Sequence, residues 1–380
     1  MISRCPECWF ELEEAQPHCG VCGATILWDR SRPVFVGYDL SGFVCNPGPR
    51  HPVYHFVGDM AGVVRLKVGF FSKRCQYACR FCGIPRSSSR TEVRASDVIA
   101  QLSLALDTHR AHLPRVQLLA LDNSGSILDC RTFSEEALAG ALRLAKDALP
   151  GVRVQLESRP EFISSSYLAH LRRLVGAPLD MQIGLETLND AIRSGVLGKA
   201  MSLAAFEAAF GRVADSGGDL SVFILVKPGV QMSEEDALLD AIETCAYLVN
   251  LAQAFGTNLL IRPCAMNAVP GTPWGDEAMS RGWTPPSLLT MARVARFVIE
   301  SGARCYLGLS EEGQTPLQNT YWRYPESTNL IHSMLHEVNH TQSLSSLDEI
   351  IARYGKSIDN RPAEEKFRTF AQPLPRTGLQ

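Results

Sequence analysis

The sequence has no run of about 18 apolar residues, and its N-terminus, Met-Ile-Ser-Arg-Cys, carries no apolar stretch. The first absence excludes a transmembrane helix, and the second argues against a secretory signal peptide. The chain also has little net charge, because its formal value is −3 over 380 residues. Overall charge therefore gives no reason to expect a nucleic-acid or membrane-surface partner. From the two absences above we expect a cytoplasmic protein.

Cysteine, in contrast, is abundant. Seven of the twelve cysteines lie in tight clusters with the spacing of metal ligands, which a secreted disulfide framework does not explain. Two C-x2-C pairs stand near the N-terminus: Cys5 with Cys8, and Cys19 with Cys22. Four thiolates in two such hairpins predict a structural zinc ribbon over residues 1–27. The ribbon could stabilise the fold, contact a partner protein or help to recognise substrate.

The second cysteine cluster is Cys75-Gln-Tyr-Ala-Cys79-Arg-Phe-Cys82. Three thiolates on one short loop can bind three irons of a [4Fe-4S] cluster. Because the usual protein set is four, the fourth iron would stay open to a non-protein ligand. This spacing therefore predicts a reactive cluster.

From residue 63 onward, apolar β-branched runs alternate with segments of helical period, which predicts an α/β fold with a parallel sheet. Helices are expected to start near Ser96, Ser134, Glu161, Ser202, Ser233 and Ser287. The pattern does not decide between an open sheet and a partial barrel. In either case the cysteine loop, which follows the first strand, would lie at the carboxyl edge of the sheet. The predicted strands are 63–70, 116–121, 153–157, 181–186, 220–226 and 258–262.

The flanking segments are less informative. Residues 28–60 are rich in Gly and Pro, and we expect a linker packed on the main domain, which covers residues 61–310. Residues 311–380 would form a C-terminal extension with a mobile tail. Within it, a predicted helix over 329–339 places His332, His336 and His340 on one face, which is more typical of a solvated or capping stripe than of a metal triad.

The motif C-x3-C-x-aromatic-C after a first strand resembles the signature of the radical S-adenosylmethionine (SAM) superfamily. The resemblance implies a (β/α)6 partial TIM barrel over residues 61–310. It also implies that Cys75, Cys79 and Cys82 hold a [4Fe-4S] cluster whose open iron binds SAM. An electron from that cluster would break a C–S bond of SAM, and the sequence does not tell which one.

The same resemblance suggests further cofactor-binding residues. Phe81 would pack over the cluster or the adenine of SAM, and Gly83 would allow a close backbone approach. Where the family has a Gly-Gly-Glu-like segment that binds the SAM amino group, this chain reads Asn123-Ser124-Gly125-Ser126. These polar groups would then replace the carboxylate.

Polar residues also end the later strands. Glu157 and Glu186 could accept hydrogen bonds from ribose hydroxyls, and Arg159 could pair with a carboxylate; each could instead form an ion pair that fixes the barrel rim. Lys227 could bind an anion, either the SAM carboxylate or substrate.

The motifs Glu-Ser-Arg-Pro-Glu and Gly-Leu-Glu-Thr, together with the Asn-Ser-Gly-Ser loop, resemble the branch that holds the archaeosine synthase radical subunit and elongator-type and methylthiotransferase-type tRNA enzymes. The expected function is therefore radical modification of a tRNA base or nucleoside-like substrate, with a reducing flavoprotein or ferredoxin as electron donor. One alternative is a radical SAM enzyme of small-molecule or peptide biosynthesis. Another is a non-catalytic iron-sulfur and zinc protein that senses redox state.

Overall fold

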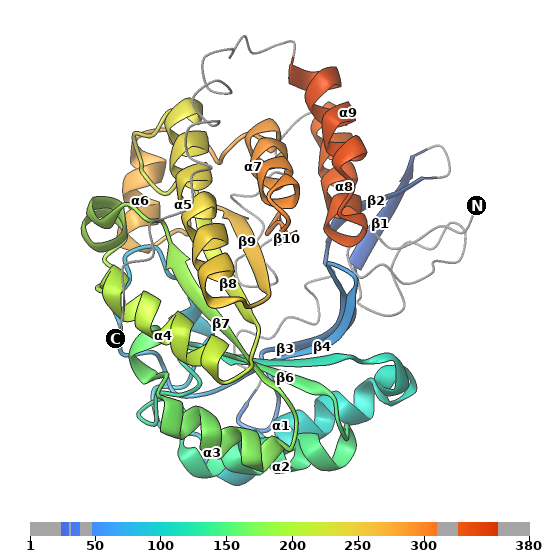
Figure 1. Cartoon of the computed structure of the whole chain (residues 1–380), viewed down its shortest axis with the longest axis vertical. Helices are drawn as coiled ribbons and strands as arrows, with labels where there is room; N and C mark the ends of the chain where they lie inside the picture. Colours follow the sequence, from blue (N-terminus) through green and yellow to red (C-terminus); the bar gives the residue numbers. More distant parts are fainter. Residues whose placement is uncertain (1–23, 30–31, 39–47, 310–325, 356–380) are drawn as a thin grey trace.

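The computed structural model describes residues 24–29, 32–38, 48–309 and 326–355. Over these ranges the chain alternates strands and helices around one curved sheet, with the helices on its outer side (Figure 1). The sheet order is β10-β9-β8-β7-β6-β5-β4-β3 within the described residues. All its neighbouring strands are parallel except β3 and β4. This curled α/β sheet confirms the expected partial barrel of radical SAM type.

Six parallel strands make up the central repeat: β4 (Val63–Phe70), β5 (Leu118–Asn123), β6 (Arg153–Glu157), β7 (Leu179–Glu186), β8 (Leu220–Val226) and β9 (Leu259–Ala265). Each is rich in branched apolar residues and is buried on both faces, as parallel strands are. The predicted bounds of β4, β6 and β8 are confirmed, and the other three strands differ from prediction by one to three residues at an end.

The helices that follow the strands are α1 (Ala95–Thr108), α2 (Glu135–Ala148), α3 (Ser165–Val175), α4 (Leu203–Asp215), α5 (Glu234–Phe255), α6 (Pro273–Ser280) and α7 (Leu288–Glu300). The predicted starts at Ser134, Ser202, Ser233 and Ser287 are confirmed, because each serine caps its helix and accepts a backbone N–H. The start predicted at Glu161 is wrong. Pro160–Phe162 form one turn of 3-10 helix, and α3 begins after Ser164, whose hydroxyl accepts from the Tyr167 amide at 3.2 Å.

The segment predicted as a linker contains strands. Tyr54–Met60 form β3, which pairs with β4 in an antiparallel manner and lies at the edge of the sheet. Ala24–Asp29 (β1) and Arg32–Tyr38 (β2) form a separate antiparallel pair. The division of the chain into domains remains a prediction. The zinc-ribbon cysteines and the predicted mobile tail beyond residue 355 lie outside the described residues.

The C-terminal part adds β10 (Arg304–Cys305), α8 (Glu326–Thr341) and α9 (Leu344–Tyr354). The histidine stripe of α8 is buried, so the expectation of a solvated or capping stripe is wrong. It is buried because α8 packs beside the edge of the sheet, where His340 Nδ1 lies 3.0 Å from Asp59 Oδ1 of β3. His332 Nε2 lies 3.3 Å from the Leu309 carbonyl oxygen, and the rings of His332 and His336 meet edge to face at 4.6 Å.

The barrel interior is not the layered aliphatic core that is usual in such folds. Apolar side chains, among them Met60, Leu118 and Leu260, form a small cluster at the amino ends of the strands, where they line a second cavity of about 350 Å³. Above them, inward positions carry charged and polar groups that are almost fully buried, among them Arg65, Lys67, Asp122, Gln155, Gln182 and Arg262.

Candidate active site

A cavity of about 290 Å³ opens at the carboxyl edge of the sheet. The cysteine loop and the ends of β5, β6, β7, β8 and β9 all contribute to its wall. This is the edge where parallel α/β folds bind ligands. The lining includes Cys75, Cys79, Phe81, Cys82, Gly83, Asn123, Ser124, Gly125, Ser126, Glu157, Arg159 and Glu186. All the predicted cluster and cofactor residues except Lys227 therefore meet at one cavity.

Two other loops and the start of α6 hold the cysteine loop in place. The Arg80 amide donates to the Leu197 carbonyl at 2.8 Å, and the Trp274 amide donates to the Arg80 carbonyl at 3.0 Å. Gly125 lies so close that a Cβ atom there would be 2.9 Å from Cβ of Cys75. A substitution at Gly125 would therefore displace the first cysteine.

The three thiols line the same cavity. In a [4Fe-4S] cluster each of them would bind a different iron as a thiolate. Burial raises the pKa of the Cys79 thiol, although Lys199 and Arg159 act against that rise. Burial also raises the pKa of Cys82 to about 12, so a bound cation would be needed to hold it as a thiolate.

The residues that flank the thiols form a close-fitting wall. Phe81 packs against the buried apolar cluster that contains Leu197, Met266 and Trp274. A Cβ atom on Gly83 would lie 2.8 Å from Cγ1 of Val269, so a larger residue there would push Val269 into the cavity or move the loop. Phe81 and Val269 therefore make one side of the cavity apolar.

The Asn123–Ser126 segment supplies the polar side. Asn123 Oδ1 accepts from the Gly125 amide at 3.0 Å, and Ser126 Oγ accepts from the Arg159 amide at 3.0 Å. Within the described part of the chain, the buried Nδ2 of Asn123 has no hydrogen-bond partner. A buried amide donor of this kind is expected to meet a ligand or water.

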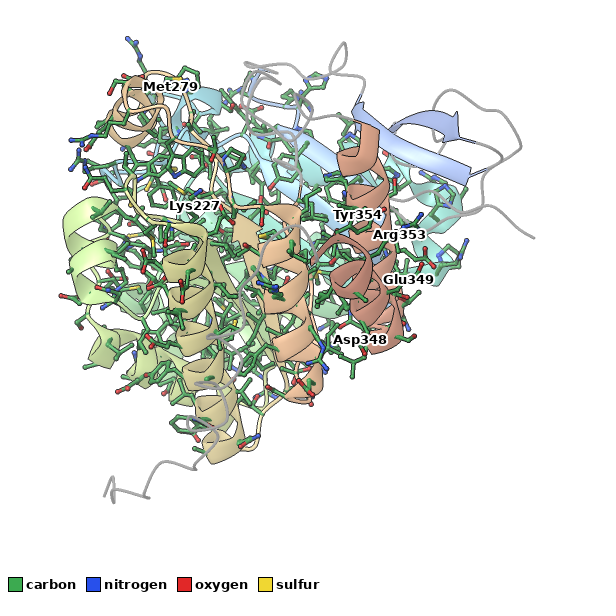
Figure 2. All side chains as sticks on the ribbon, turned by 90° about the horizontal axis from the view of Figure 1, so that it is seen from above. Lys227, Met279, Asp348, Glu349, Arg353 and Tyr354 are labelled. Carbon is green, nitrogen blue, oxygen red and sulfur yellow. The ribbon has the colours of Figure 1, made fainter. Side chains whose placement is uncertain are left out.

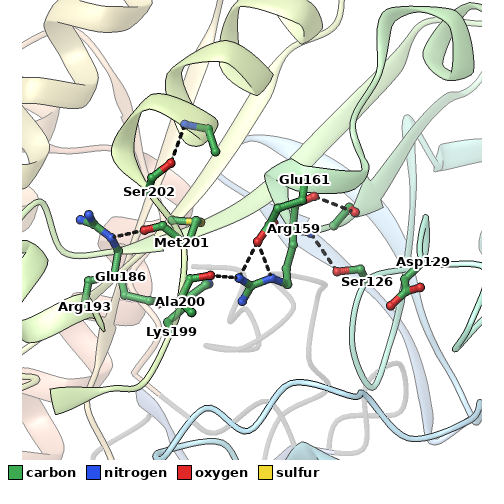
Figure 3. Close-up of polar contacts among 12 residues, drawn as sticks. Ser126, Asp129, Arg159, Glu161, Glu186, Arg193, Lys199, Ala200, Met201 and Ser202 are labelled. Atoms are coloured by element: carbon green, nitrogen blue, oxygen red, sulfur yellow. Dashed lines mark hydrogen bonds and ion pairs between the residues drawn. The ribbon is translucent and has the colours of Figure 1, made fainter. Parts of the chain in front are cut away.

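Arg159 joins the loop after β6 to the loop that leads into α4. Its guanidinium donates to Glu161 Oε1 at 2.6 Å and to the Ala200 carbonyl at 2.7 Å (Figure 3). It also lies 3.9 Å from the centre of the Tyr77 ring. Arg159 therefore forms an ion pair with Glu161 and also lines the cavity.

Glu186 and Lys199 form a buried ion pair in the cavity wall. Glu186 ends β7 with a φ of 69°, beside a register shift between Gly184 and Glu186. A residue other than glycine in this region costs free energy, and such strain gathers at functional sites. Lys199 was not predicted, since it lies in a loop 13 residues after Glu186 and no strand end marks it.

Lys227 does not line the cavity. Its backbone has a φ of 65°, and its ammonium lies 2.7 Å from Glu234 at the start of α5 and 3.5 Å from Thr284. Figure 2 shows Lys227 on the α6 side of the molecule, across the view from the α9 residues Asp348 and Glu349. Lys67 of β4, in contrast, does line the cavity.

Comparisons with known proteins agree with this architecture. Residues 70–242 match the family model described as the radical SAM superfamily, and the chain carries a radical SAM domain. An uncharacterized protein of Methanocaldococcus jannaschii is 24% identical over 47% of this chain and 50% of its own length. Archaeosine synthase subunit beta of Methanosarcina acetivorans is 26% identical over 51% of this chain and 57% of its own. The chain thus spans about half the length of these curated relatives.

Among solved structures, the crystal structure of methylornithine synthase is 14% identical and covers 66% of this chain and 72% of that chain, with a TM-score of 0.46. In the described residues no helix is both long and apolar enough to cross a bilayer.

Proposed function

We propose that this protein cleaves SAM reductively to start a radical modification of a tRNA base or a nucleoside-like substrate. The observation that carries the proposal is the meeting of Cys75, Cys79 and Cys82 at the cavity of a radical SAM domain. These thiolates would hold a [4Fe-4S] cluster, which supplies when bound the electron that breaks a C–S bond of SAM.

The chain's own residues would bind SAM and keep water away. Phe81 and Val269 offer the apolar wall against which an adenine could pack. Asn123 Nδ2 offers a buried donor, and Lys199 and Arg159 bring positive charge to the wall that also holds the thiols. These two cations, which pair with Glu186 and Glu161, would also suit the carboxylate of SAM, one of the two anions that the sequence suggests for Lys227.

The substrate part of the proposal rests on the name archaeosine synthase subunit beta, which the relative from Methanosarcina acetivorans carries, and on the resemblance to tRNA enzymes described above. The word subunit in that name also favours a partner chain, and the electron must come from a flavoprotein or ferredoxin. The zinc ribbon would help to grip the RNA or that partner.

Anaerobic reconstitution with iron and sulfide, followed by reduction in the presence of SAM, tests the first step. We expect 5'-deoxyadenosine in the chromatogram, or methylthioadenosine if another C–S bond breaks, and the absence of both from protein loaded with iron would contradict the proposal. Filter binding of total tRNA at low and moderate salt tests the substrate class. Binding that weakens as salt rises is expected for contacts with phosphates, and no binding at low salt would exclude tRNA.

A further inference from the structure

The second cavity, of about 350 Å³, lies at the amino ends of the barrel strands, opposite the cysteine loop. The residues that line it stand at the starts of β5 to β10 and where β3 meets β4. None of them also lines the cavity of the proposed active site, so the two cavities are separate sites. Its volume is at the lower end of the range of ligand pockets, which suits a molecule of few atoms.

One side of this second cavity carries two carboxylates on one guanidinium. Arg153 Nε donates to Asp180 Oδ2 at 2.9 Å, and Arg153 Nη2 lies 2.8 Å from Asp219 Oδ2. One positive and two negative charges give these three residues, the acidic network, a net charge of −1. The side chains of Arg153 and Asp219 are 38% and 25% exposed, so a ligand can reach the network from solvent.

The same cavity is lined by a cation that the acidic network does not neutralise. Arg304 of β10 is half-buried, and within the described residues its side chain forms no hydrogen bond and no ion pair. A guanidinium presents several N–H donors, two of which can meet a carboxylate in parallel. Since the network carries −1 and Arg304 carries +1, the charges that line the cavity sum to zero while Arg304 stays unpaired.

Two deeply buried polar groups also face this cavity. Ser221 is 1% exposed and Gln155 is 5% exposed. In the part of the chain that the structure describes, Ser221 Oγ and Gln155 Oε1 have no hydrogen-bond partner. Buried polar groups of this kind are expected to meet a ligand or water. Met60, Leu118 and Leu260 add an apolar wall, so the cavity combines opposite charges, unused hydrogen-bonding groups and apolar surface.

We propose that this second cavity binds a free amino acid with an apolar side chain. Arg304 would pair with the carboxylate, to which the Ser221 hydroxyl can also donate. The acidic network and Gln155 Oε1 would accept from the ammonium, and the apolar side chain would lie against the apolar wall. A zwitterion satisfies the cation and the acidic network together, without adding net charge to the barrel. The site goes beyond the function proposed above and does not depend on it.

Ligands with a single charge suit the cavity less well. A phosphate or a simple carboxylate would pair with Arg304 but would also face the carboxylates of Asp180 and Asp219, which repel it. A simple amine would contact the acidic network but would leave Arg304 unpaired and bring a second cation near it. The charges and the volume therefore favour a small zwitterion.

Isothermal titration of the full-length protein with valine, leucine, methionine and phenylalanine tests the proposal. Each amino acid that binds is compared with the matching amine and the matching acid, which for leucine are isoamylamine and isocaproate. Since a hydrogen bond to a charged group corresponds to roughly a 10- to 100-fold change in affinity, the amine and the acid should each bind at least about 10-fold more weakly. If none of the four binds at millimolar concentration, the cavity holds water only and the inference is overturned. Equal binding of the amine or the acid would also overturn it.

Variants show whether Arg304 is responsible. Arg304→Met should weaken amino-acid binding by roughly 10- to 100-fold, because the carboxylate loses its cation. Arg173→Met, on the exposed face of α3, is the matched control and should leave the affinity unchanged, and equal affinities of the two variants would refute the inference. If Arg304→Met fails to fold, as judged by circular dichroism, the comparison with the amine and the acid decides the matter.

The same preparations are also assayed for SAM cleavage after reconstitution. Cleavage without amino-acid binding would refute only this inference, and binding without cleavage would refute only the proposed function.

Discussion

Arg193 stabilises the segment that brings Lys199 to the cavity. Its side chain is 1% exposed, although it carries a full charge. The guanidinium donates to the Thr187 carbonyl at 2.8 Å and to the Leu188 carbonyl at 3.1 Å. It also donates to the Met201 carbonyl at 3.1 Å (Figure 3). It thereby closes the loop that leaves β7 and returns to α4.

Replacing Arg193 by Met keeps the length of the side chain but removes every donor. Three backbone carbonyls then lose a charged donor, and each such loss costs roughly 1 to 3 kcal/mol. The losses are not additive because the loop can relax, so we expect the free energy of unfolding to fall by about 3 to 5 kcal/mol. The ion pair with Asp190 adds little, since that carboxylate is 72% exposed.

Urea unfolding followed by circular dichroism measures the loss, and Arg173→Met on the exposed face of α3 is the control. The Arg193 variant should also bind less iron after reconstitution, because the Leu197 carbonyl of the same loop holds the Arg80 amide of the cysteine loop. A loss of under about 1 kcal/mol, or equal effects of the two substitutions, would refute this account of Arg193.

Other predictions concern the iron-sulfur cluster and the zinc. Alanine at Cys75, Cys79 or Cys82 should abolish the cluster absorbance near ~400 nm and the formation of 5'-deoxyadenosine, whereas alanine at the exposed Cys130 should leave both intact. Gly125→Ala should lower the iron bound per chain because of its contact with Cys75, while Gly195→Ala, which has open space around it, should not. Serine at Cys5 or Cys19 should remove zinc measured by mass spectrometry, and unchanged zinc would contradict the ribbon.

The sequence predicts most of the architecture because local signals agree with the fold. Serine caps and runs of branched apolar residues mark where helices and strands begin, and the cysteine spacing identifies the loop. Strand β3 could not be found in this way. Its sequence, Tyr-His-Phe-Val-Gly-Asp-Met, contains a glycine and a charged residue, and its strand form depends on pairing with β4.

The sequence could not predict the side-chain positions at the site, and the reason is different. The end of a strand indicates the edge that a residue reaches but not the direction of its side chain. Glu157 and Lys227 each end a strand, yet the first lines the cavity and the second pairs with Glu234 of α5. Lys199 reaches the wall through a loop whose path depends on the buried Arg193, and such tertiary support leaves no short motif in the sequence.

The buried charged side chains inside the barrel lower the stability of the fold, and packing gives no reason for them. Arg65 is 1% exposed, and within the described residues its Nε and Nη1 have no hydrogen-bond partner, although Phe56 and Tyr306 lie 5.4 and 5.3 Å from its guanidinium carbon. Each unsatisfied buried donor costs roughly 1 to 3 kcal/mol, and aliphatic residues of similar size would avoid that cost. Lys67 and Glu157 stand on β4 and β6 and line the cavity, so the polar interior continues up to the cavity wall. The polar interior therefore favours a substrate that reaches into the barrel over one that only touches its rim.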